Sequence, residues 1–123
     1  MGKFVIKEVK TGFKFDLKAG NGEVIATSEV YTTEAACKKG IESVIKNAAV
    51  AGVEDQTVEE FEKVKHPKFE MYADNAGEFR FRLKATNGEV IAVSEGYKAK
   101  ASCKNGIESV VKNAADAEVV KAE

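Results

Sequence analysis

Side chains that carry catalytic chemistry are scarce in this 123-residue chain. His66 is the single histidine, and it lies in a polar segment without a recognisable motif for a general base. Cys37 and Cys103 occupy matching apolar positions, where a buried and inert thiol is expected. Ser28 stands beside Glu29 with no neighbouring base to take its proton. We therefore predict that the chain is not an enzyme and that it uses no cofactor and no metal.

A short polar pattern occurs twice in the chain. Ser28, Glu29 and Tyr31 recur as the same residue types 66 positions later. The pattern fits the connection between a strand and a helix, with the glutamate near the positive end of that helix. A polar ligand site that is used twice is the alternative that the sequence leaves open.

Basic side chains gather at alternate positions of two segments, residues 13–19 and 79–85. Strict alternation of apolar and polar residues predicts strands with one buried face and one solvated face. In a shared sheet, the solvated faces are expected to form one basic stripe with five candidate contacts for nucleic acid or another anion: Lys14, Lys18, Arg80, Arg82 and Lys84. The phenylalanines of both segments alternate onto the opposite side, so these strands offer no aromatic platform on which bases stack. A charged face that only meets solvent is the simpler interpretation, and binding of nucleic acid or another anion is the alternative.

An internal repeat explains why these features come in pairs. Residues 13–49 match residues 79–115 at a constant offset of 66, and 26 of the 37 positions are identical. Repeats of this kind indicate one structural unit used twice. We assign residues 1–56 to the first repeat, residues 57–68 to a linker and residues 69–123 to the second repeat.

Each repeat is predicted to form three strands, a helix and a short last strand. In the first repeat, Asn21-Gly22 supplies a tight turn between the second and third strands. Four apolar residues are then spaced four, three and four apart, as on one face of a helix: Cys37, Ile41, Val44 and Ala48. One helix over one small sheet leaves apolar surface open. The two repeats are therefore predicted to share one antiparallel sheet with both helices on one face, in the α+β class.

The hairpin sequence resembles a known family. Residues 21–29 with Tyr31, and their counterparts in the second repeat, resemble the YegP-like proteins, a family of uncharacterised bacterial tandem-repeat proteins. Residues 13–19 and 40–44 also match, and the resemblance covers nearly the whole chain outside the linker. It implies tandem βββαβ repeats in one continuous sheet, with the last strand of each repeat exchanged to the other. It implies no activity, substrate or catalytic residue.

Net charge and hydropathy limit the classes of function that remain. The net charge is −1, so no global field attracts the chain to nucleic acid or to a membrane. No apolar run approaches the ~20 residues of a membrane span, and the N-terminal sequence has no signal-peptide pattern, so we expect a cytoplasmic protein. Because the duplicated chain is already a pseudo-dimer, we expect a monomer. These observations lead to a small non-enzymatic structural or binding module, with weak binding of nucleic acid or another anion through the basic face as the alternative.

Overall fold

The computed structural model describes residues 2–115 and 117–122, and these form two copies of one unit. The first copy contains β1 (Lys3–Val9), β2 (Gly12–Lys18), β3 (Val24–Thr27), α1 (Glu34–Ala48) and β4 (Gly52–Asp55). The second copy contains β5 (Lys68–Ala73), β6 (Phe79–Lys84), β7 (Val90–Val93), α2 (Lys100–Ala115) and β8 (Glu118–Lys121). The predicted tandem βββαβ organisation is therefore confirmed.

Local sequence explains where the chain turns and where the first helix begins. Gly22 and Gly88 adopt φ angles of 87° and 84° in the β2–β3 and β6–β7 hairpins, a conformation that side chains disfavour. Thr33 precedes α1, and its hydroxyl oxygen accepts the backbone N–H of Ala36 at 3.0 Å. The glycine turn is thus common to both copies, whereas the threonine cap belongs to α1, because Ala99 stands at the matching position before α2.

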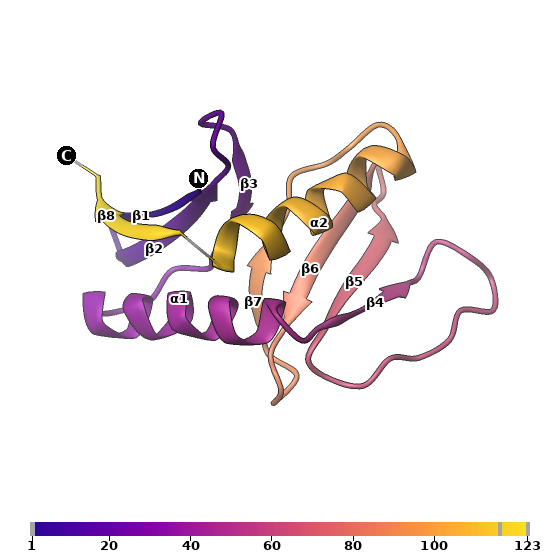
Figure 1. Ribbon diagram of the computed structural model, residues 1–123, viewed down its shortest axis with the longest axis horizontal. Helices are drawn as coiled ribbons and strands as arrows, with labels where there is room; N and C mark the ends of the chain where they lie inside the picture. The colour runs from indigo at the N-terminus through magenta and orange to yellow at the C-terminus, as the bar shows by residue number, and fades with distance from the viewer. Residues whose placement is uncertain (1, 116, 123) are drawn as a thin grey trace.

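All eight strands of the described residues form one sheet in the order β4-β5-β6-β7-β3-β2-β1-β8. The last strand of each copy lies beside the first strand of the other, so the exchange implied by the family resemblance is confirmed (Figure 1). The sheet is not antiparallel throughout, because β4 and β8 run parallel to their neighbours β5 and β1. A parallel neighbour needs a connection that returns the chain to the same end of the sheet. Residues 56–67 make that return between β4 and β5.

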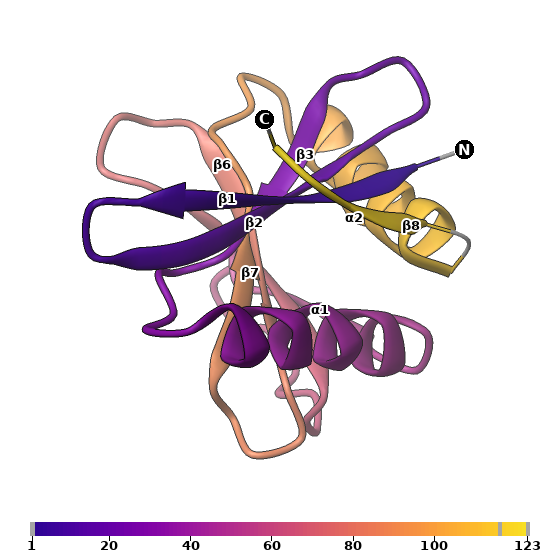
Figure 2. The same cartoon turned by 90° about the vertical axis from the view of Figure 1, so that its left-hand side faces the viewer.

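Both helices pack on one face of the strongly twisted sheet, as predicted (Figures 1 and 2). The centre of the core holds four fully buried aromatic rings, which form two edge-to-face pairs: Phe4 with Phe15 and Phe69 with Phe81. The apolar stripe of α1 that contains Cys37 joins the same core, as does its counterpart on α2. Neither described helix is long and apolar enough to cross a membrane.

The helix glycines make room for a tyrosine. A Cβ built on Gly40 would lie 2.7 Å from Cζ of Tyr31, whose ring stacks on Phe15. A Cβ on Gly106 would likewise lie 2.9 Å from Cζ of Tyr97. The glycines cost helix propensity of about 1 kcal/mol each relative to alanine. They allow each helix to approach closely the tyrosine that follows β3 or β7.

Candidate anion-binding face

We call the sheet face opposite the helices the open face. It carries the five basic residues predicted from the sequence, with Lys14 and Lys18 on β2 and Arg80, Arg82 and Lys84 on β6. β3 and β7 lie between those two strands and meet only through the pair Thr27–Val93. The basic residues therefore form two groups instead of one continuous stripe. We call β8, β1 and β2 the first half of the open face, and β4, β5 and β6 the second half.

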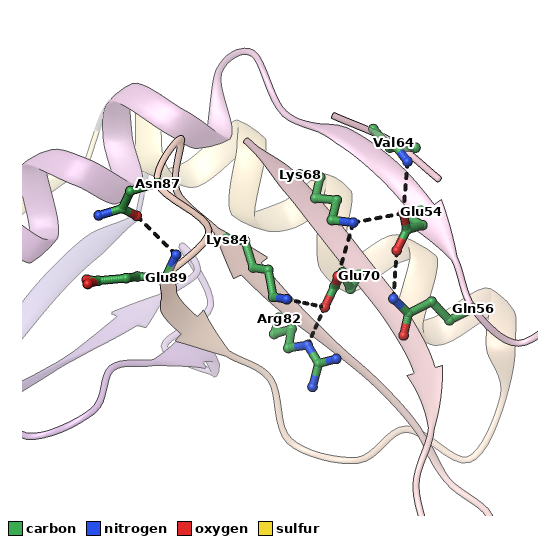
Figure 3. Close-up of polar contacts among 9 residues, drawn as sticks. All are labelled: Glu54, Gln56, Val64, Lys68, Glu70, Arg82, Lys84, Asn87 and Glu89. Carbon is green, nitrogen blue, oxygen red and sulfur yellow. Dashed lines mark hydrogen bonds and ion pairs between the residues drawn. The ribbon is translucent and has the colours of Figure 1, made fainter. Parts of the chain in front are cut away.

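Carboxylates neutralise much of the basic charge in the second half. Glu70 of β5 lies between three cations, with Arg82 Nε at 2.5 Å, Lys68 Nζ at 3.2 Å and Lys84 Nζ at 3.3 Å (Figure 3). The Glu70 side chain is only 4% exposed. Burial alone would raise the pKa of Glu70, but hydrogen bonds from Arg82, Lys68 and Lys84 outweigh it, and the pKa lies below the ordinary value. Two of the predicted contacts, Arg82 and Lys84, are therefore already engaged inside the protein.

Glu54 extends this ion network to the edge strand and to the linker. Its carboxylate accepts Lys68 Nζ at 2.8 Å, Gln56 Nε2 at 2.6 Å and the backbone N–H of Val64 at 2.8 Å (Figure 3). Burial would raise the pKa of Glu54, but these hydrogen bonds lower it to about 2. Through Glu54, the exchanged strand β4 and the linker thus cover Lys68, which is 7% exposed.

Arg80 has a separate partner at the junction of the two copies. Its Nε donates to Oδ2 of Asp74 at 2.7 Å, and its Nη1 donates to the carbonyl of Ser94 at 3.4 Å. It borders a hollow of about 280 Å³ on the open face, which is also lined by Thr27 and Val93. All three basic residues predicted on β6 therefore make ion pairs with carboxylates of the same chain.

Among the described residues, the first half of the open face has fewer ion pairs between its strands. Lys7 pairs with Oδ2 of Asp16 at 2.5 Å, and the hydroxyl of Thr27 donates to the other oxygen of Asp16 at 2.8 Å. Within the described residues, Lys3, Lys14 and Lys18 make no ion pair. Lys3 lies directly opposite Lys18, and Lys7 lies directly opposite Lys14. The first half thus places two pairs of like charges across one strand boundary.

Sequence reasoning missed the neighbouring strands that complete this face. The missed residues are Lys3 of β1, Glu54 of β4, and Lys68, Glu70 and Tyr72 of β5. Tyr72 brings an aromatic ring to the open face, and the guanidinium of Arg82 lies 4.6 Å from its centroid. The alternation of Lys68, Phe69, Glu70, Met71 and Tyr72 was a usable signal, because it has the same period of two as β6.

Ser28 and the two cysteines are buried, and Ser28 has a structural role. Ser28 Oγ accepts the backbone N–H of Phe15 at 2.9 Å and donates to the carbonyl of Glu29 at 2.7 Å, so it holds the connection after β3. Cys37 and Cys103 are buried and unpaired, and burial raises the pKa of Cys103 to about 11. Among the described residues, no three His, Cys, Asp or Glu side chains are placed to hold a metal ion.

Comparison with known proteins places the chain in a family. The model of a domain of unknown function, DUF1508, matches residues 10–55 and again residues 74–120. The chain belongs to the DUF1508 family. A member of the same group from Stutzerimonas stutzeri, described as a UPF0339 protein in the ptx operon 5′ region, is 40% identical over 121 residues, which are 98% of this chain and 96% of that protein.

Two further DUF1508 relatives bear on the fold. The solution structure of YegP from Escherichia coli, a protein of unknown function, superposes with a TM-score of 0.79 at 34% identity and covers 98% of this chain and 91% of that chain. The YegP-like resemblance is therefore confirmed. A UPF0339 protein from Treponema denticola is 67% identical over 54 residues, which are 44% of this chain but 93% of that protein. That relative therefore has the length of a single repeat.

Proposed function

We propose that the chain is a non-enzymatic binding module and that the open face is its binding surface. The helices cover the other face of the sheet, so the open face is available along β1 and β2. One observation carries the proposal: three open-face positions are basic in both copies, but within the described residues only the second copy engages them in ion pairs. These position pairs are Lys3 and Lys68, Lys14 and Arg80, and Lys18 and Lys84.

The first half is the part of this surface that favours an anionic partner. Like charges directly opposite one another across two strands destabilise a sheet. The pairs Lys3–Lys18 and Lys7–Lys14 have only Asp16 between them, and both oxygens of Asp16 are already engaged. A bound polyanion relieves this repulsion. A single-stranded nucleic acid is the polyanion we propose, bound weakly and with little sequence preference, because lysines contact phosphates without reading bases.

Location and assembly are part of the same proposal. We place the chain in the cytoplasm, where thiols stay reduced, in keeping with its unpaired Cys37 and Cys103. We also propose a monomer, because each exchanged strand finds its partner within the same chain. Sedimentation at micromolar concentration should give the mass of one chain, and a two-chain mass would contradict the monomer. Recovery of a tagged chain from the periplasm would contradict the location.

Fluorescence anisotropy of labelled single-stranded RNA and DNA tests the binding function. Saturable binding is expected at low salt, with weaker binding at physiological salt. The double variant Lys14→Glu/Lys18→Glu should abolish it. Lys46→Glu/Lys112→Glu is the matched control, because it makes the same change of net charge on the helix side and should leave most of the binding intact. Equal losses in both variants, or no binding at high micromolar protein, would refute the function.

A further inference from the structure

The second half of the open face shows how this sheet holds a carboxylate. Lys68 and Lys84 are direct cross-strand partners on β5 and β6. Their ammonium groups contact the two oxygens of one carboxylate, with Lys68 at 3.2 Å from Oε2 and Lys84 at 3.3 Å from Oε1 of Glu70. The cross-strand lysine pair thus supplies two of the three cations that hold this carboxylate, and Arg82 Nε at 2.5 Å from Oε1 is the third. The protein supplies the oxyanion itself.

The first half contains the same lysine pair without the carboxylate. Lys3 and Lys18 are direct cross-strand partners on β1 and β2, in the register of Lys68 and Lys84. The register places Val5 opposite Asp16, where the second half has Glu70 opposite Arg82. Valine also replaces the second internal acid, because Val120 of β8 pairs with Val5 as Glu54 of β4 pairs with Glu70.

Two carboxylates lie near this lysine pair, and neither occupies it. Asp16 is committed to Lys7 through Oδ2 and to the hydroxyl of Thr27 through Oδ1. Glu118 of β8 is the register partner of Lys3, but it is exposed and makes no ion pair within the described residues. Lys3 is likewise exposed, so its ammonium group is accessible to a ligand from solvent.

We propose that Lys3 and Lys18 form a binding site for one oxyanion, a carboxylate or a phosphate group, located above Val5. The bound group takes the place that the Glu70 carboxylate occupies in the second half. Charge-assisted hydrogen bonds from two ammonium groups hold it, and these are stronger than bonds between neutral groups. The inference deepens the proposed function and rests on it for biological meaning, because the site supplies one phosphate contact of a polyanion. The site itself is testable with small anions.

The experiment follows the backbone amide resonances of the whole chain during titration with inorganic phosphate and, separately, with acetate at constant ionic strength. Saturable shifts are expected at β1 and β2 around Val5. Shifts in both titrations identify a general oxyanion site, whereas shifts with phosphate alone narrow the ligand to phosphate groups. Lys3→Gln and Lys18→Gln should each weaken binding about tenfold, as expected for the loss of one charged hydrogen bond. Lys84→Gln is the matched control and should leave the affinity unchanged, because Lys84 is already engaged by Glu70.

Val5→Glu tests the internal-ligand argument directly. It places a carboxylate beside Lys3 and Lys18, so it should abolish phosphate binding. No gain in stability is expected, because the new carboxylate faces Asp16 where Glu70 faces Arg82. Val5→Gln, which has nearly the same size without the charge, should leave phosphate binding intact. The site is refuted if phosphate shifts persist in Val5→Glu, if Lys84→Gln weakens binding as much as Lys18→Gln, or if no shift saturates at β1 and β2.

The two proposals fail in different ways. Phosphate binding that disappears in Val5→Glu, together with no binding of RNA or DNA, removes the nucleic-acid function and retains the oxyanion site. RNA binding that Lys14→Glu/Lys18→Glu abolishes, together with no saturable phosphate or acetate shift at β1 and β2, retains the function and removes the site.

Discussion

Replacement of Glu70 by glutamine is expected to lower the free energy of unfolding by about 3 kcal/mol, at the lower end of the range for breaking a buried ion pair. The variant leaves Lys68, Arg82 and Lys84 with Glu54 as the remaining carboxylate of the network. The lower end applies because the Arg82 and Lys84 side chains are 32% and 24% exposed, so water screens part of the unpaired charge. Urea unfolding at neutral pH measures the loss.

Glu34→Gln provides the control for this first prediction. Glu34 also contacts two lysines, Lys38 at 3.3 Å and Lys121 at 2.8 Å, but its side chain is 29% exposed. Ion pairs that water screens contribute little to stability, so this variant should lower the free energy of unfolding much less than Glu70→Gln does. Equal losses for Glu70→Gln and Glu34→Gln would contradict a buried network at Glu70.

Glu54→Gln is expected to remove a pH-dependent part of the stability. The pKa of Glu54 in the folded chain is about 2, below its ordinary value of 4.5. A carboxyl whose pKa is lowered by folding stabilises the fold fully above its unfolded pKa, and this contribution declines as the pH falls towards the folded pKa. The difference in unfolding free energy between the parent chain and Glu54→Gln should therefore be constant from pH 7 to about pH 5 and should shrink below it.

Urea unfolding of both proteins between pH 7 and pH 3 checks this second prediction. Asp55 also has a pKa lowered to about 2, against burial, by hydrogen bonds from Lys100 and Thr57. It is present in both proteins, so its contribution cancels in the difference. A difference that stays constant down to pH 3 would show that Glu54 is not the group that titrates.

Much of the fold followed from local patterns. The alternation in residues 13–19 and 79–85 correctly predicted β2 and β6 and the side on which Lys14 and Arg82 lie. The helical spacing from Cys37 correctly predicted the buried face of α1. These patterns are reliable because each depends on neighbours within a few residues, and because both copies repeat them.

The charge balance of the open face did not follow from the sequence, because it depends on long-range register. Glu70 meets Arg82 only through the β5–β6 register, and Glu54 meets Lys68 only because β4 is exchanged onto the second copy. β4 has only four residues, too few for a clear alternation of apolar and polar side chains. Its sequence therefore did not indicate which of these residues are buried. The sequence therefore suggested one basic stripe, where the structure has one neutralised group and one group of lysines without carboxylate partners.

The first half of the open face, and not the second, is expected to hold the anionic partner. The most direct measurement is the salt dependence of single-stranded RNA binding by the parent chain, by Lys14→Gln/Lys18→Gln and by Arg82→Gln/Lys84→Gln. Each phosphate contact contributes about 0.7 to the slope of log affinity against log salt. We predict a slope that is less steep by about 1.4 in the first variant and nearly unchanged in the second. A slope that is reduced only in the second variant, or equally in both, would contradict the account.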